Sequence, residues 1–329
     1  MRCKPFVLVA LFLNLAAALH AAETPQTALL VLAKSDQALF IVNPATREVV
    51  AQVPSGPDPH EVIASTDGKF AYISNYGGGA YNTITVVDLL QQKALPVIDL
   101  GALRGPHGLA FVGGKLWFTA EGAKVIGSYD PAIRKIDWVL GTGQDRTHMI
   151  YVFADLNRMI TSNVSSATMT IIEKGNAAGR GQPPPPRGGP PAGMPNAGPP
   201  GGGLMRPPQT NWTEAVVPVG RGAEGFDVAP DGKEIWVANA QDGTISIVDL
   251  ATKKVVQTLQ ANVHGANRLK FTPDGKHVLV SSLGGSDLVI IDAATRKDNK
   301  RLKIGSGAAG ILMQPDGHAL TWLARRMTM

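Results

Sequence analysis

The sequence predicts an all-β protein, a seven-bladed β-propeller built from four-stranded repeats of about 40 residues. Two observations lead to this fold class. Asp-Gly turns recur at Asp231, Asp274 and Asp316, with spacings of 43 and 42 residues. The 329 residues include 37 Gly and 24 Pro, a composition that favours many turns over long helices. Repetition at this period is typical of propeller blades, whose radial packing shelters the sheet edges.

Each repeat carries the pattern of four short strands. In the repeat that begins at Gly222, segments 234–238 and 245–248 are rich in β-branched and aromatic residues and alternate with a period of two. An Asp-Gly pair predicts a tight hairpin between the first two strands. Residues 249–254 predict the turn between the third and fourth strands. Further copies follow from Gly265 and Gly307, and earlier copies surround His60, His107 and His148.

The count of first strands sets the number of blades. Six first strands are predicted, and residues 28–53 supply three strands of another blade that has no first strand. Seven blades follow if the C-terminal end returns to provide that innermost strand. The pattern stops after Gly317, about one hairpin and one strand short of a full ring. We therefore expect an incomplete last blade.

Two segments fall outside the repeats. Residues 1–22 begin with basic side chains and continue with an apolar stretch. This pattern predicts a secretory signal peptide and therefore a periplasmic or secreted protein. After its removal we expect one propeller domain, residues 23–329, with no membrane span. Residues 175–210 are a Pro/Gly-rich loop insertion between the third and fourth strands of the third complete repeat. Their composition predicts disorder.

Composition also excludes several kinds of function. The single cysteine, Cys3, lies in the predicted signal, so the mature chain has no disulfide, thiolate zinc site or cysteine nucleophile. Without Arg2 and Lys4, 29 basic and 26 acidic residues remain, and a net charge of +3 is too small to predict nucleic-acid binding. The absence of a Cys-x-x-Cys-His segment excludes covalent c-type haem attachment.

Short motifs inside the repeats resemble those of a known family. They are YISN at 72–75, ITSN at 160–163, WVAN at 236–239 and ISIVDLATKKVV at 245–256. These units resemble the YVTN-repeat β-propellers, the YncE-like group, over nearly all of the mature chain. Relatives of that group include haem d1-handling and nitrite-reductase-like propellers, amine dehydrogenase heavy chains and seven-bladed lactonases. The resemblance therefore implies a fold without selecting one activity.

Alignment of the repeats predicts a shared site at the mouth of the central channel. One equivalent position, at the start of each innermost strand, is occupied by His60, His107, His148, Glu224, Asn267 and Ala309. Three arginines precede this position in the loops between blades: Arg104, Arg146 and Arg221. Imidazole, guanidinium and carboxylate groups that converge on one concavity suit an anionic ligand or a metal ion. His60, His107 and His148 are the candidate metal ligands.

Three functions stay open at this point. The favoured one is an exported binding or scaffold protein. Its His/Arg-lined funnel holds a small anionic or metal-bearing ligand, either a metal ion or a non-covalent haem-like group, in the service of a redox partner. Catalysis stays open, and an enzyme would be a lactonase-like hydrolase or a subunit of an oxidoreductase. The second is a lactonase-like hydrolase that uses the same funnel, as the resemblance to lactonases implies. The third is a protein-interaction module without a small-molecule site, in which the histidines hydrogen-bond neighbouring loops and the strand-end asparagines cap their own turns. In each case we expect a monomer.

Overall fold

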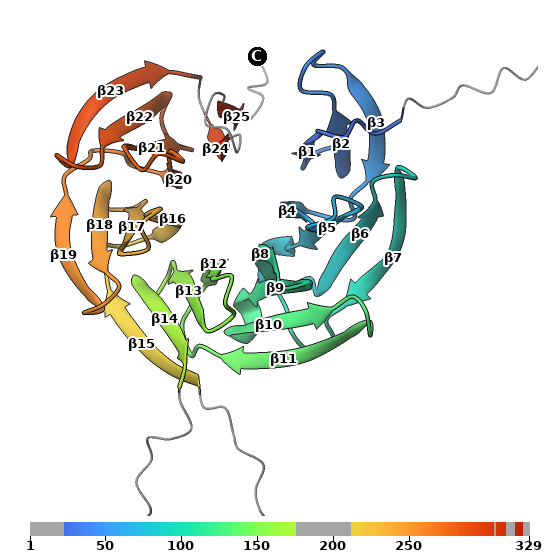
Figure 1. Ribbon diagram of the computed structural model, residues 1–329, viewed down its shortest axis with the longest axis horizontal. Coiled ribbons are helices and arrows are strands. Elements are labelled where there is room, and N and C mark those ends of the chain that lie inside the picture. Colours follow the sequence, from blue (N-terminus) through green and yellow to red (C-terminus); the bar gives the residue numbers. More distant parts are fainter. Residues whose placement is uncertain (1–22, 176–211, 306, 314–319, 325–329) are drawn as a thin grey trace, which may run out of the picture.

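The computed structural model describes residues 23–175, 212–305, 307–313 and 320–324. Over these residues the chain forms a ring of antiparallel sheets (Figure 1). Five sheets have four strands, one has three and one has two. The prediction of a seven-bladed propeller with an incomplete last blade is thus confirmed. The predicted signal peptide and residues 176–210 of the insertion lie outside the described residues.

Seven blades follow one another along the chain. Blade 1 contains β1 (Leu29–Ala33), β2 (Ala38–Val42) and β3 (Val49–Pro54). Blade 2 contains β4 (Pro59–Ala64), β5 (Phe70–Asn75), β6 (Thr83–Asp88) and β7 (Lys93–Asp99). Blade 3 contains β8 (Pro106–Val112), β9 (Lys115–Ala120), β10 (Val125–Asp130) and β11 (Lys135–Gly141). Blade 4 contains β12 (Thr147–Val152), β13 (Arg158–Asn163), β14 (Thr168–Lys174) and β15 (Trp212–Pro218).

The remaining blades complete the described part of the ring. Blade 5 contains β16 (Ala223–Val228), β17 (Glu234–Asn239), β18 (Thr244–Asp249) and β19 (Lys254–Leu259). Blade 6 contains β20 (Ala266–Phe271), β21 (His277–Ser282), β22 (Asp287–Asp292) and β23 (Lys297–Lys303). Blade 7 contains β24 (Ala308–Met313) and β25 (Leu320–Ala324). Two 3₁₀ turns, η1 (Gly77–Gly79) and η2 (Glu121–Ala123), follow β5 and β9.

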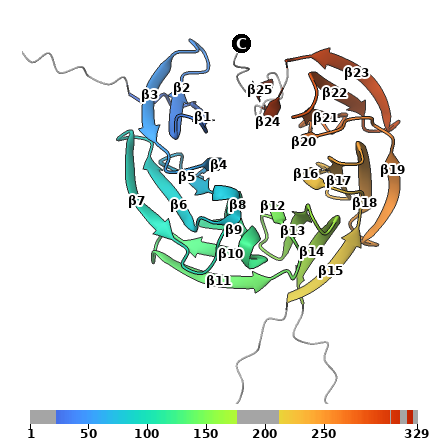
Figure 2. The same cartoon turned by 180° about the vertical axis from the view of Figure 1, so that it is seen from behind.

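Each blade is a meander that runs from the channel to the rim. Successive strands pair antiparallel in chain order, and both views place the first strands β4, β8, β12, β16 and β20 nearest the centre (Figures 1 and 2). In blade 4, Lys174 on β14 faces Trp212 on β15 across the ladder. The Pro/Gly-rich segment therefore connects two neighbouring strands of one sheet.

Two of the Asp-Gly pairs form the predicted hairpins, and the third, at Asp316, lies outside the described residues. At Asp231-Gly232 the glycine has φ 71°, a left-handed conformation that costs glycine little. Its N–H donates to the carbonyl of Ala229 at 2.8 Å, and the Asp231 carboxylate accepts the N–H of Lys233 at 3.0 Å. The same hydrogen bonds recur at Asp274-Gly275. These turns fix the length of each first hairpin and therefore the register of the innermost strand.

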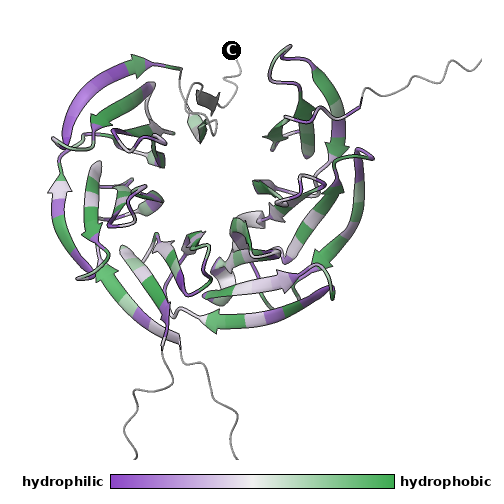
Figure 3. Cartoon of the chain, viewed as in Figure 1, coloured by the Kyte–Doolittle hydropathy of each residue, from purple (hydrophilic) through white to green (hydrophobic). Residues whose placement is uncertain are grey.

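The hydrophobic core lies between blades rather than at the centre of the ring. Six clusters of buried apolar side chains each join one blade to the next. Trp236 of blade 5, for example, packs edge-on against Phe271 of blade 6, with ring centroids 5.6 Å apart. The outer strand β23 is hydrophilic, whereas the neighbouring β22 is apolar (Figure 3). Layered packing of this kind leaves polar side chains at the channel without disturbing the core.

Neighbouring first strands approach one another closely near the axis. A Cβ on Gly108 would lie 2.5 Å from the carbonyl oxygen of His148, and a Cβ on Gly225 would lie 2.4 Å from that of Asn267. Both atoms belong to the backbone of the next blade, which cannot turn away as a flexible side chain can. Glycine at these positions allows the close contact of the inner strands.

We predict that Gly225→Ala lowers the free energy of unfolding by about 1–3 kcal/mol, because the added methyl group must push two inner strands apart. Gly141→Ala is the matched control, since nothing lies within 4 Å of a Cβ at that position. Urea unfolding of both variants measures the difference. Equal midpoints for the two variants would contradict close blade contact at Gly225.

Candidate functional site

The candidate site begins at the second residue of each innermost strand. The structure places the aligned residues there in every case: His60 in β4, His107 in β8, His148 in β12, Glu224 in β16, Asn267 in β20 and Ala309 in β24. The pairing with the second strand shifts just after the first residue in all six strands. A bulge of this kind re-aims side chains and leaves backbone groups outside the ladder.

A hydroxyl from the second strand binds these released backbone groups. The N–H of Gly108 donates to Oγ1 of Thr119 at 2.8 Å, and the same hydroxyl donates to the carbonyl of His148 in the next blade at 2.7 Å. Two other blades repeat the relay: Glu61 N–H to Ser74 to His107 C=O, and Met149 N–H to Ser162 to Glu224 C=O. The relay ties each second residue to the preceding blade.

The three histidine rings contact one another in a row, each tilted relative to the next. The centroids of His107 and His148 are 3.6 Å apart, and those of His60 and His107 are 4.3 Å apart. The ring of Tyr76 adjoins this row, with centroids 4.9 Å from His60 and 5.2 Å from His107. Three consecutive blades therefore bring their imidazoles into direct contact.

His148 lies between two carboxylates. Its Nδ1 contacts Oε1 of Glu121, and its Nε2 is 2.7 Å from Oε2 of Glu224. Tyr76 donates its hydroxyl to Oε2 of Glu121 at 2.5 Å. Arg146 is 3.6 Å from Glu121 and 3.9 Å from Glu224. These contacts join residues of blades 2, 3, 4 and 5 with the loop that precedes β12.

Opposite environments separate the pKa values of the three imidazoles. Burial would lower the pKa of His148, but its hydrogen bonds to Glu121 and Glu224 outweigh burial and raise the pKa. Burial and the charge of Lys34 lower the pKa of His60 to about 4. Burial and the charge of His148 hold the pKa of His107 well below its usual value. The carboxylates therefore favour the imidazolium form of His148, whereas burial favours the neutral forms of His60 and His107.

The same contacts with His148 favour the ionised forms of the Glu121 and Glu224 carboxylates. Burial would raise the pKa of Glu121 and of Glu224, but hydrogen bonds from His148 outweigh it and lower both values. Arg146 adds a further favourable charge to each. The centre of the cluster is thus a charge-balanced network.

His107 is the exception in this network. Its side chain is 1% exposed, and neither ring nitrogen has a hydrogen-bond partner among the described residues. A buried polar group without a partner costs roughly 1–3 kcal/mol. The donor atoms of His107, Glu121 and His148 all lie within 4.8 Å of one another, close enough for these residues to hold a metal ion.

His60 differs from the other two histidines. Its Nδ1 lies 2.9 Å from the ammonium group of Lys34, which is also 2.8 Å from Asp58. Lys34 follows β1, so blade 1 contributes a residue to the cluster. It does so although its described sheet has three strands and lacks the first, innermost one. The donated hydrogen bond places the ring proton of neutral His60 on Nε2.

Not every predicted residue joins the cluster. Arg221 is exposed and pairs with Asp242 at 2.7 Å, and Arg104 contacts the carbonyl of Ala80 at 3.4 Å. Asn267 accepts a hydrogen bond from Arg268, whose guanidinium also contacts Glu61 across the channel. Of the three predicted arginines, Arg146 alone contacts the site's carboxylates.

Sequence reasoning missed Tyr76, Arg268 and Glu61 as members of the site, whereas the strand end at Glu121 falls on the face that the repeat alignment favours. Tyr76 and Glu121 each follow the last residue of a second strand, and the repeat alignment carries that signal. Arg268 and Glu61 occupy the third position of inner strands, and their side chains contact each other. The strand-end asparagines instead bind their own hairpins: Asn239 donates to Thr244 and Ser246 at 2.9 Å.

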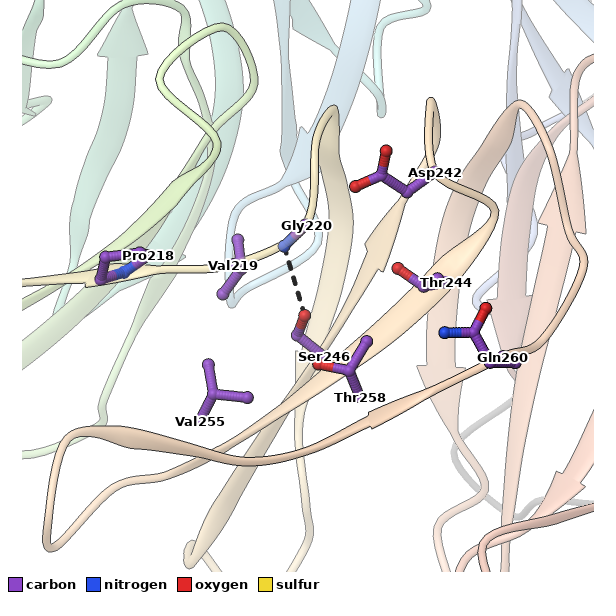
Figure 4. Close-up of a pocket in the computed structure, with 9 residues that line it drawn as sticks. All are labelled: Pro218, Val219, Gly220, Asp242, Thr244, Ser246, Val255, Thr258 and Gln260. Carbon is purple, nitrogen blue, oxygen red and sulfur yellow. Dashed lines mark hydrogen bonds between the residues drawn. The ribbon is translucent and has the colours of Figure 1, made fainter.

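A separate hollow of about 610 Å³ lies away from the histidines, at the junction of blades 4 and 5. Figure 4 shows its lining, which includes Asp242, Thr244 and Ser246 and consists of short polar and apolar side chains. The Gly220 N–H donates to Ser246 there at 3.4 Å. It contains one ionisable residue, so we place the candidate site at the His/Glu cluster.

Comparison with known proteins agrees with this fold. The family model described as YncE-like β-propeller matches residues 209–318. That segment is similar to YncE-like propellers. The structure also superposes on a chain of Kuenenia stuttgartiensis hydrazine synthase with a TM-score of 0.67 and 16% identity, covering 91% of this chain and 92% of that one. This likeness concerns the fold alone.

Two further findings concern curated relatives and membrane-spanning helices. A search among curated proteins found no significant sequence match. Within the part of the chain that the structure describes, no helix is long and apolar enough to cross a membrane.

We predict that Thr119→Val lowers the free energy of unfolding by about 1–3 kcal/mol, because it leaves the Gly108 N–H and the His148 carbonyl without the shared hydroxyl. Thr213→Val, which removes an exposed hydroxyl bonded to the Glu173 carbonyl, is the control. Chemical denaturation compares the two. The relay has no energetic role if both substitutions change the stability equally.

Proposed function

We propose that this protein is an exported binding propeller that holds a small anionic or metal-bearing ligand at the mouth of its channel. The observation that supports this proposal most strongly is the convergence of four side chains from consecutive inner strands: His60, His107, His148 and Glu224. Stability of the ring does not require ionisable groups there, since the apolar layers lie between the blades. Concave sites with a few convergent polar groups are where propellers and other folds bind ligands.

The exposed cations of the cluster supply the contact for an anion. The side chains of Arg146 and Lys34 are each 43% exposed. The separations of Arg146 from its two carboxylates, 3.6 and 3.9 Å, exceed a direct N–H···O hydrogen bond. Its guanidinium can therefore turn toward an incoming carboxylate or phosphate, which it can bind in a bidentate manner.

Burial favours binding over hydrolysis. A general base must reach the proton that it removes, whereas His107 is 1% exposed and His148 is 4% exposed. Both nitrogens of His148 are already engaged by carboxylates. The lactonase-like alternative would need a ring nitrogen of His148 free to act as the base, so we favour a ligand-binding role without catalysis. Export remains part of the proposal and rests on the composition of residues 1–22.

A ligand screen tests this proposal. The purified protein is unfolded thermally with millimolar phosphate, sulfate, citrate and other small carboxylates, each alone and with a divalent metal ion. We expect at least one of them to stabilise the fold, by about 2.7 kcal/mol when its concentration is 100 times the Kd.

Two arginine variants locate the effect. Arg146→Gln should abolish the stabilisation, whereas Arg221→Gln should retain it, because Arg221 is paired with Asp242 outside the cluster. Absence of stabilisation by every ligand, or full stabilisation in Arg146→Gln, would refute binding at the channel mouth.

A further inference from the structure

The unpaired state of His107 distinguishes it from every other group in the cluster. Each carboxylate and each charged nitrogen around it has a partner, whereas both nitrogens of His107 are buried without one among the described residues. Its ring is held from two sides by His60 and His148. Its carbonyl is fixed by Ser74. A neutral imidazole positioned in this way presents a lone pair that no protein donor uses.

The neighbouring groups have the chemistry of metal ligands. Two imidazoles and one carboxylate, with donor atoms within 4.8 Å of one another, come from His107, His148 and Glu121. Ligands of a tetrahedral zinc ion lie about 3.4 Å apart, given metal–ligand bonds of roughly 2.1 Å. Small rotations of the three side chains would bring their donor atoms from within 4.8 Å of one another to this shorter separation.

The contacts around these three residues are those of an outer coordination shell. Nε2 of His148 contacts Glu224 at 2.7 Å, which leaves Nδ1, on the side of Glu121, as the ligand atom. The second oxygen of Glu121 accepts the hydroxyl of Tyr76 at 2.5 Å. Carboxylate–histidine contacts and hydrogen-bonded ligand carboxylates orient the ligands of protein metal sites.

From this arrangement we propose that His107, His148 and Glu121 bind one divalent transition-metal ion of the zinc or cobalt class. The inference rests on the proposed function, since it names what the same cluster holds. The ion takes the position of the Nδ1 proton of His148, which is released to solvent. The positive charge between the carboxylates is thereby retained. Open coordination positions on the ion would then receive the small anion beside Arg146.

His60 adjoins this ion without binding it. Its Nδ1 accepts the hydrogen bond of Lys34, so its Nε2 carries a proton and has no lone pair for a metal. The repeat alignment favours His60 as the third metal ligand. In the proposed site Glu121 takes that place. His60 closes the side of the site opposite His148.

Titration calorimetry with ZnCl₂ on protein treated with a chelator tests the inference. We expect one ion per chain, with His107→Leu and Glu121→Gln each weakening the binding by about 100-fold or more, since even outer-shell changes cost 10–100-fold. His264→Ala, which removes an exposed histidine of a neighbouring loop, should bind as the original protein does. Because His107 has no hydrogen-bond partner to lose, His107→Leu should still fold.

A spectroscopic measurement gives a second readout. Co²⁺ in the same protein should show visible d–d absorption of a low-coordinate site, and His107→Leu should lose it. Zinc binding that survives in both His107→Leu and Glu121→Gln, or no stoichiometric binding of either ion, overturns the inference. Stabilisation by anions alone that still depends on Arg146 would leave the binding function standing without the metal.

Discussion

The site depends on one backbone constraint, the bulge at the start of every innermost strand. There the second residue leaves the ladder of its own blade, and in blades 2 to 5 the third residue leaves it as well. In three blades a Ser or Thr hydroxyl links these backbone groups to the next blade. Buried peptide groups must find such partners. The hydroxyl relay therefore fixes not only the fold of each inner strand but also the direction in which His107, His148 and Glu224 face.

Charge and burial then act on what the backbone has brought together. His148 becomes an imidazolium because two carboxylates surround it, and those carboxylates stay ionised because it does. The same charge, together with burial, keeps His107 and His60 neutral. An arrangement with one satisfied imidazolium beside an unpaired neutral imidazole is suited to a metal ion or a metal-bearing ligand, since both lone pairs and counter-charges are in place.

The sequence predicts those features of the fold and the site that follow the repeat. Asp-Gly turns fix hairpin length, so counting from Asp231 or Asp274 locates the second residue of an inner strand without coordinates. Loop residues lack such a period. Arg104, Arg146 and Arg221 precede their strands at similar offsets, yet Arg146 turns toward the carboxylates while Arg221 pairs with Asp242. Lys34 was beyond prediction because it comes from blade 1, whose first strand the repeat pattern lacks.

His148 of blade 4 and Glu224 of blade 5 are distant in the sequence but meet in one network at the channel mouth. A double-mutant cycle between His148 and Glu224, with His148→Gln, Glu224→Gln and the double variant, measures this directly through the free energy of unfolding. The 2.7 Å contact predicts a coupling energy of about 1–3 kcal/mol. Additive effects, within about 0.5 kcal/mol, would show that the two side chains do not meet at the channel mouth.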